Sequence, residues 1–226
     1  MIHGQKGSRF YDRPLWVQWL AAVVMALMCL LVMVTMIDLF SRWPATGILW
    51  WLYVPVAQFL NTPLFRLTGI YRYYSPMLIG YMANEQRIDL HSGGSFDYLL
   101  WLRGTRPGLP VRQRLLAWHV QGLLYLITEI EQGRLPETVE VSGTSYFFNH
   151  HSMKALGFRL EEPGWFYRLN LLVNALDLIW MYSLARGKWA IPQLGHAQKA
   201  ITTGAILVQH KAKIAELHRQ LELRLQ

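Results

Sequence analysis

Four side chains that could do chemistry lie in or directly after two similar segments of this sequence. Residues 89–96 read Asp-Leu-His-Ser-Gly-Gly-Ser-Phe, and residues 140–146 read Glu-Val-Ser-Gly-Thr-Ser-Tyr. In each segment, Ser-Gly-x-Ser directly follows alternating polar and apolar residues, which predicts a strand and then a turn. Serine, histidine and aspartate are the residue types of a serine hydrolase. The candidate catalytic residues are therefore His91, Ser95, Asp97 and Ser145.

The two predicted turns are also candidates for binding an anion. Glycine lets backbone N–H groups converge and serine adds hydroxyl donors, so two such turns at one sheet edge could hold a phosphate. The alternative is that Ser-Gly-x-Ser is simply good turn chemistry. Neither segment has a P-loop lysine or the spacing Gly-x-Gly-x-x-Gly, so any cofactor stays unknown. The candidate ligand-binding residues are Ser92, Gly93, Gly94, Ser95, Ser142, Gly143, Thr144 and Ser145.

Other kinds of site have less support in the sequence. Adjacent His150 and His151 point in different directions in a helix or a strand, and no His-x-x-x-His or Glu-x-x-His spacing completes a metal site. We therefore predict no metal ligands. The Gly-x-Ser-x-Gly turn of serine hydrolases is also absent. Cys29 is the single cysteine, so the chain forms no intramolecular disulfide, which fits a reducing compartment.

An apolar run near the N-terminus predicts a membrane anchor. Residues 14–37 are 24 positions without a charge, enough helix to cross a bilayer core of about 30 Å. The run is longer than the roughly 7–15 apolar residues of a signal peptide, and no small-x-small cleavage site follows it. Residues 44–65 are a second uncharged stretch, which contains Pro55 and Pro63. We expect spans over about 15–38 and 45–65, with a re-entrant or interfacial segment as the alternative for the second.

Basic residues set the expected orientation of these spans. They lie mainly outside the two spans: Lys6, Arg9 and Arg13 before the first, Arg66 and Arg72 after the second, and Arg42 alone between them. The positive-inside rule then places both termini in the cytoplasm of a multi-pass protein of the inner (plasma) membrane. Tyr71, Tyr73 and Tyr74 follow the second span, and we expect them at headgroup level.

The charge balance bears on the expected partners. From Tyr73 onward, 16 basic minus 12 acidic residues leave +4 of the net +8. That balance suits a domain near anionic headgroups and needs no nucleic acid. The lipid bilayer is therefore the first expected partner.

The remaining residues predict a small cytoplasmic α/β domain with largely parallel strands. Alternating and helical patterns place strands at 87–91, 139–141 and 158–160, a long helix between the first two, and a short helix that Asn149 caps. Strands that alternate with helices favour parallel pairing. The expected order is a basic N-terminus (1–13), a transmembrane helical hairpin (14–66), a juxtamembrane segment (67–86), the α/β domain (87–190) and a long C-terminal amphipathic helix (193–225).

Two helical segments follow in the C-terminal half. The first, after Pro163-Gly164, carries a polar stripe of Asn170, Asn174 and Asp177, which we expect to be a solvated face; contact with a polar ligand is the alternative. That helix should lie on the sheet or in the headgroup plane. A third transmembrane span over about 167–185 is the alternative, in which Asp177 would be costly. The C-terminal helix should contact a protein partner or a second copy, with packing on its own domain as the alternative. Its apolar residues fit a and d positions imperfectly: Leu207, Ile214, Leu217 and Leu221.

Residues 112–160 resemble the second half of the GCN5-related N-acetyltransferases. The shared features are a long helix, a strand, an asparagine, a short helix and Leu156-Gly157-Phe158. The resemblance implies acyl transfer. That family has an Arg-x-x-Gly-x-Gly/Ala loop for pyrophosphate before its long helix, whereas this chain has Arg103-Gly104-Thr105-Arg106-Pro107-Gly108.

Two functions from different classes follow. The first is a noncatalytic membrane-anchored adaptor or accessory protein, which fits the absence of a complete catalytic constellation. The second is a membrane-tethered enzyme, a transferase or hydrolase of acyltransferase-like character. It would act on a phosphate- or acyl-bearing substrate at the two Ser-Gly-x-Ser turns. The sequence leaves open whether the chain is an enzyme.

Overall fold

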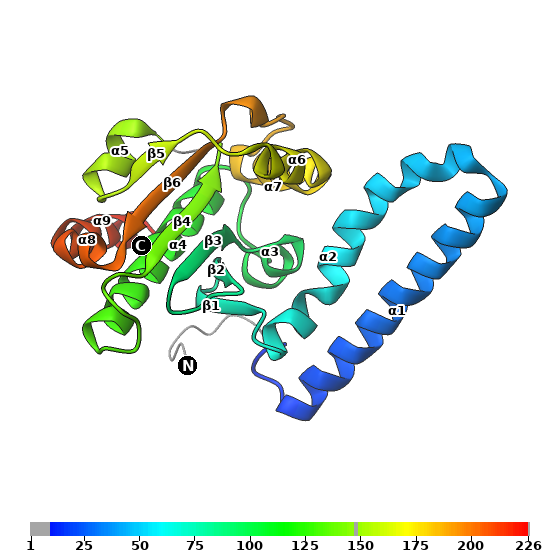
Figure 1. The fold of residues 1–226 in the computed structure, drawn as a ribbon, viewed down its shortest axis with the longest axis horizontal. Helices are drawn as coiled ribbons and strands as arrows, with labels where there is room; N and C mark the ends of the chain where they lie inside the picture. Colours follow the sequence, from blue (N-terminus) through cyan, green and yellow to red (C-terminus); the bar gives the residue numbers. More distant parts are fainter. Residues whose placement is uncertain (1–9, 147–148, 226) are drawn as a thin grey trace.

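Two long antiparallel helices stand beside an α/β domain in the computed structural model of this chain (Figure 1). The structure describes residues 10–146 and 149–225, so the expected basic residues Lys6 and Arg9 lie outside it. The two long helices are α1 (Leu15–Arg42) and α2 (Trp50–Leu67), joined by the 3-10 helix η1 (Pro44–Leu49).

The domain contains six described strands and seven described α-helices. In chain order they are β1 (Tyr71–Ser75), β2 (Leu78–Tyr81), β3 (Arg87–Ser92), α3 (Ser95–Trp101), α4 (Leu109–Glu131), β4 (Glu140–Ser145), α5 (His150–Ala155), β5 (Arg159–Glu161), α6 (Trp165–Val173), α7 (Ala175–Arg186), the 3-10 helix η2 (Leu194–His196), β6 (Gln198–Thr203), α8 (Gly204–Gln209) and α9 (Lys211–Leu223).

α1 is mostly apolar and is largely exposed on the side that does not contact α2. Of its 28 residues only Ala22 and Cys29 are buried. Cys29 faces α2, where its Sγ lies 3.3 Å from the Tyr53 hydroxyl and 3.1 Å from Asn61 Nδ2. Among the described helices, α1 is the one that is long and apolar enough to cross a membrane.

The sheet has six strands and mixed pairing, in the order β1-β2-β3-β4-β6-β5. Only β3 and β4 pair in parallel, through the long crossover that contains α4, and the other described pairs are antiparallel. The expectation of largely parallel strands is therefore wrong. It failed because three strands that pair in antiparallel fashion were not recognised: β1 and β6 carry few aliphatic residues, and β2 is only four residues long.

β1 and β2 lie in the segment 67–86, which the sequence pattern had placed at the membrane surface. Tyr74 is buried in the core instead of lying at headgroup level. It packs closely on β2, because a Cβ added to Gly80 would lie 2.8 Å from the Tyr74 ring. The sheet therefore begins at Tyr71 rather than at residue 87.

The local prediction around Asn149 is confirmed. Asn149 caps α5, because its Oδ1 accepts hydrogen bonds from the backbone N–H groups of His151 and Ser152 at 2.9 and 3.4 Å. Gly157 then ends the turn with a positive φ of 85°, which glycine adopts without strain. β5 follows where a third strand was expected.

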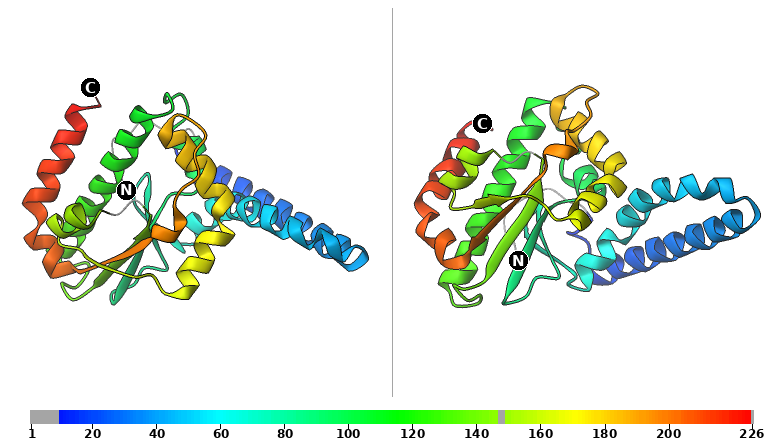
Figure 2. Two further views of the ribbon diagram at one scale, coloured as in Figure 1. Left: turned by 90° about the horizontal axis from the view of Figure 1, so that it is seen from above. Right: turned by 45° about the horizontal axis from the view of Figure 1, so that its top comes forward.

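One face of the sheet packs on α4 and α9, which lie side by side in Figure 2. The core between them consists of aliphatic side chains from the sheet and the helices: Ile88, Leu90, Val141, Leu126, Ile127, Ile130, Leu207, Ile214 and Leu221. α1 and α2 project from the other end of the domain. The hydrophobic core thus uses a different face of the molecule from the exposed apolar surface of α1.

The predicted single helix over 193–225 is wrong in its first part. Residues 198–203 form β6, which lies between β4 and β5 and is antiparallel to both. Ala200 and Thr202 alternate with partly exposed residues and are buried, as in a strand with one covered face. Ile214 and Leu221 are buried against the core that contains α4. The apolar residues of α9 thus pack within the domain itself. Association with a partner through α9 stays a prediction, and it would have to use the charged face of the helix.

The packing of α9 on α4 predicts the effect of shortening one buried side chain of α9. Ile214→Ala should lower the free energy of unfolding by about 2–5 kcal/mol, because it leaves a cavity under a fully buried side chain. Lys213→Ala, at the exposed neighbouring position, should change it by less than about 0.5 kcal/mol. Denaturant unfolding of the purified protein measures both. Equal stability of the two variants would contradict the packing of α9.

Candidate functional site

The two segments singled out in the sequence meet at one edge of the sheet. β3 and β4 are parallel neighbours, and their last residue pair is Leu90 with Gly143. Beyond that pair the strands part, because β3 continues along β2 and β4 continues along β6. The carboxyl ends of parallel strands are where open α/β sheets bind ligands. The structure therefore brings the two segments to one plausible place.

The second segment, Ser142–Ser145, is part of β4 and is not a turn. The prediction failed because Ser-Gly-x-Ser is typical of turns and glycine is a weak strand former, whereas β6 pairs with all six residues of β4. Ser142 is buried and its hydroxyl lies 3.3 Å from Asp89 Oδ1. A Cβ on Gly143 would lie 3.0 Å from the carbonyl oxygen of Leu90. Close strand pairing thus accounts for this glycine without a ligand.

The first segment does form a turn, but its backbone donors are used inside the chain. The N–H of Gly93 donates to the carbonyl oxygen of Met77 at 3.1 Å, and the N–H of Gly94 donates to Asp97 Oδ2 at 3.1 Å. A Cβ on Gly93 would lie 3.0 Å from Asp97 Cβ. The Gly94 N–H thus caps the start of α3 through Asp97, and the Gly93 N–H extends the pairing of β2 with β3. Both donors are engaged within the chain.

Ser95 ties α3 to α7. Its buried hydroxyl donates to Asp177 Oδ1 at 2.7 Å and accepts a hydrogen bond from Trp180 Nε1 at 2.8 Å. Burial raises the pKa of Asp177 above its ordinary value, although the hydrogen bonds from Ser95 and Trp180 lower it in part. Sequence reasoning missed both partners of Ser95. The available signal was an aspartate in an otherwise apolar helix.

The polar stripe on α6 and α7 is buried at its α7 end, whereas Asn170 is exposed as expected. Asp177 is only 7% exposed, and Asn174 Oδ1 accepts a hydrogen bond of 2.6 Å from Gln58 Nε2 of α2. Asn174 in turn donates to Asn170 Oδ1 at 2.9 Å. The stripe therefore lies where α7 meets α2 and α3, and the expectation of a solvated face is wrong for Asp177.

Asp97 is fully buried where the two long helices join the domain. Its carboxylate accepts hydrogen bonds from the Tyr73 hydroxyl at 2.9 and 3.0 Å and from the N–H of Gly94. The Arg66 guanidinium of α2 lies 3.5 Å over the ring of Tyr11 and 4.5 Å from the ring centre of Tyr73. Burial raises the pKa of Asp97 to about 7, although Tyr73, Gly94 and Arg66 pull it down in part.

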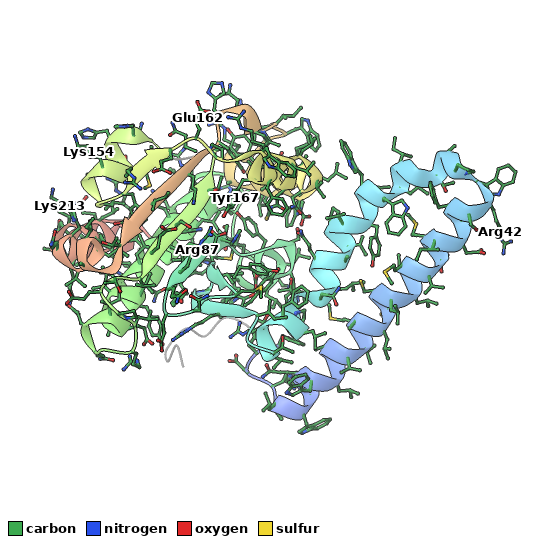
Figure 3. All side chains as sticks on the ribbon, viewed as in Figure 1. Arg42, Arg87, Lys154, Glu162, Tyr167 and Lys213 are labelled. Carbon is green, nitrogen blue, oxygen red and sulfur yellow. The ribbon has the colours of Figure 1, made fainter. Side chains whose placement is uncertain are left out.

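His91 and Asp89 belong to a third group of polar residues, on the face of the sheet opposite the core. His91 Nε2 lies 3.4 Å from Asp89 Oδ2. Tyr167 of α6 donates to the same oxygen at 3.0 Å and accepts from Arg87 at 2.8 Å, and Figure 3 shows Arg87 and Tyr167 near each other. Burial alone would raise the pKa of Asp89, but His91, Tyr167 and Arg87 hold it below its ordinary value. The candidate catalytic residues thus have separate partners.

Ser145 lies at the end of β4, where it pairs with Gln198 of β6. Its backbone is therefore part of the sheet, while Ser95 opens a helix that packs on α7. His91, Ser95 and Asp97 therefore have different hydrogen-bond or ion-pair partners and do not form a triad with one another.

An apolar groove runs between α2, α3 and α7. It consists of two adjoining hollows of about 500 and 420 Å³, which share Phe59, Leu99 and Trp180. Ser95 and Asp177 line the smaller hollow, and Arg103 lines the larger one. The groove therefore has largely apolar walls, and a hydroxyl, a carboxyl group and a basic side chain are among the groups that line it.

Comparisons of the chain with known proteins identify no relative. No family model, no curated protein and no solved structure matches the chain. Among residues 10–146 and 149–225, no group of three or more His, Cys, Asp or Glu side chains is placed to hold a metal ion. The order of elements behind the N-acetyltransferase resemblance is present as α4, β4, α5 and β5. At the start of α4, however, the N–H of Gly108 donates to the carbonyl oxygen of Leu184 on α7 at 2.9 Å.

The raised pKa of Asp97 predicts a pH dependence of stability. The folded protein keeps this proton up to about pH 7, whereas an unfolded chain releases it near pH 4. The folded state then binds more protons between these values, so this contribution is complete below about pH 4 and is lost as the pH rises towards about 7. Asp97→Asn should flatten that decline, as measured by thermal unfolding at several pH values. An unchanged decline in Asp97→Asn would show that another group causes it.

Proposed function

We propose that this chain is an integral protein of the inner (plasma) membrane, anchored by α1 and α2 as a transmembrane hairpin with both termini in the cytoplasm. One observation carries the proposal: α1 is an apolar helix of 28 residues, and only two of them are buried. Exposure of that much apolar surface to water costs roughly 25 cal/mol for each Å². Lipid removes this cost.

The positions of the tryptophans support a spanning helix. Trp16 and Trp43 are exposed at opposite ends of α1. They are 43 − 16 = 27 residues apart, which is about 40 Å of helix and matches a bilayer of about 40–45 Å including its headgroups. Tryptophan prefers this interfacial depth. The second span rests on α2, which is shorter and contains Pro55 and Pro63.

For the α/β domain that this anchor would hold at the membrane, we propose a noncatalytic role as an adaptor or accessory protein. The support is the hydrogen bonding of the candidate catalytic residues. In the described part of the chain, the side-chain partners of Ser95 are Asp177 and Trp180, and neither is a histidine. Asp97 is held by Tyr73. These bonds fix α3 against its neighbours and leave no base-activated nucleophile of the usual kind.

A membrane-tethered enzyme is the second candidate, and the apolar groove favours it. An acyl chain would fit walls formed by Phe59, Leu99 and Trp180. The Ser95 hydroxyl would then be the nucleophile, with Asp177 as the acceptor of its proton. The groove favours an acyl-bearing over a phosphate-bearing substrate, because the N–H groups of Gly93 and Gly94 are already engaged.

The hairpin predicts a topology. Reporter fusions after Trp43 and after Arg87 should give opposite compartment signals, because α2 would carry the chain back across the membrane between them. A fusion after Arg13 should give the same signal as the fusion after Arg87. The same compartment for Trp43 and Arg87 would limit α2 to the membrane surface.

The noncatalytic role predicts that Ser95 does not react as a nucleophile. The purified protein in detergent should not be labelled by a fluorophosphonate probe, since Ser95 lacks an activating histidine. Intact mass measurement reads the result. Labelling that Ser95→Ala abolishes and Ser92→Ala preserves would favour the enzyme instead, because Ser92 belongs to the same segment but is exposed.

A further inference from the structure

Helix α6 exposes an apolar face that no described part of the chain covers. Trp165, Phe166, Leu169 and Leu172 are 76%, 65%, 47% and 49% exposed. Their spacing of one, four and seven residues places them on one side of a helix. Leu176 of α7 continues the same stripe and is exposed as well. Contiguous exposed apolar surface of this kind marks an interaction site.

The opposite side of α6 is fixed to the sheet. The Tyr167 hydroxyl donates to Asp89 at 3.0 Å and accepts from Arg87 at 2.8 Å, and both of these residues belong to β3. Lys199 of β6 lies 5.8 Å from the Tyr167 ring centre. These contacts set the rotation of α6 about its axis, so its apolar face points away from the sheet.

The corner between α6 and α7 touches α2 part of the way along the two long helices. Gln58 of α2 donates to Asn174 at 2.6 Å. Cys29 of α1 contacts both Tyr53 and Asn61, so it lies at about the height of Gln58. From Cys29 to the end of α1 at Arg42 there are 42 − 29 = 13 residues, which rise about 20 Å.

This rise of about 20 Å is shorter than the hydrocarbon core of a bilayer. The core therefore extends past the height of the corner between α6 and α7. A hydrocarbon core of about 30 Å that contains the far part of α1 must extend about 10 Å beyond the height of Gln58, and any tilt of α1 increases the overlap. Figure 1 and Figure 2 show α6 and α7 next to α2, on the side from which the two long helices project. The polar side chains at this depth, Gln58 and Asn174, satisfy each other.

We propose that α6 is an interfacial helix whose apolar face lies in the headgroup and acyl boundary of the membrane that holds α1. The occupant of this face is the lipid of the cytoplasmic leaflet, because α6 ends at the corner that contacts α2 and its exposed residues are apolar, as in interfacial helices that reach about 5–10 Å into this boundary. The proposal rests on the membrane anchoring proposed above. It makes the domain a body held flat on the bilayer rather than one suspended from a tether.

Single-cysteine variants with an environment-sensitive fluorophore test this placement. In a Cys29→Ala background, Leu169→Cys reports on the apolar face of α6, and Leu27→Cys reports on an exposed position in the middle of α1. Lys154→Cys is the matched control, since Figure 3 shows Lys154 on the side of the domain away from the two long helices. The labelled full-length proteins are reconstituted in phosphatidylcholine and phosphatidylglycerol nanodiscs with and without brominated acyl chains.

The probes at Leu169 and Leu27 should emit at shorter wavelength than the probe at Lys154, and brominated lipid should quench both at least about twofold more strongly. Lipid contact at Leu27 with a water-exposed Leu169 would overturn the placement of α6 and leave the anchor intact. A probe at Leu169 that is shifted but not quenched would mean that protein covers the face, which also overturns it. A water-exposed Leu27 would overturn the membrane anchor itself.

Discussion

A buried carboxyl group joins the two halves of this molecule. Asp97 lies where the chain enters α1, where α2 ends and where β1 and α3 begin, and it holds Tyr73 and the N–H of Gly94. Arg66 stacks over Tyr11 and Tyr73 beside it. Burial of a carboxyl group is costly unless its hydrogen bonds are made, so these partners must keep their positions. The Arg66 side chain connects the end of α2 to this cluster through the ring of Tyr73.

The features that the sequence predicted well depend on neighbours in the chain. The long helix α4 follows from its apolar spacing, and the start of α5 follows from Asn149, whose oxygen accepts from N–H groups only two and three residues away. β3 has the alternation that a strand with one buried face requires. Each of these signals fits inside a few turns of helix or one strand, so it can be read locally.

The features that were missed depend on distant partners. β4 and β6 use serine, threonine and glycine in strands that exist because they pair with each other. Ser95 and Asp97 were singled out as candidate catalytic residues, but their hydrogen bonds are made with Asp177, 82 residues from Ser95, and with Tyr73, 24 residues from Asp97. The sequence pattern predicted that Asp177 is solvated, but its carboxyl group is buried because α7 packs against α3. No spacing rule within one segment contains that information.

The order of the strands determines when the sheet can form during synthesis of the chain. β6 is the last strand to be synthesised, yet it lies between β4 and β5. Until residue 203 has left the ribosome, β4 has one unpaired edge and β5 has no strand to pair with. The sheet therefore cannot be completed before then. The apolar α1 and α2 emerge more than 130 residues earlier. Synthesis from the N-terminus therefore exposes the helices first and completes the sheet last, and the domain assembles with its N-terminal helices already committed to their surroundings.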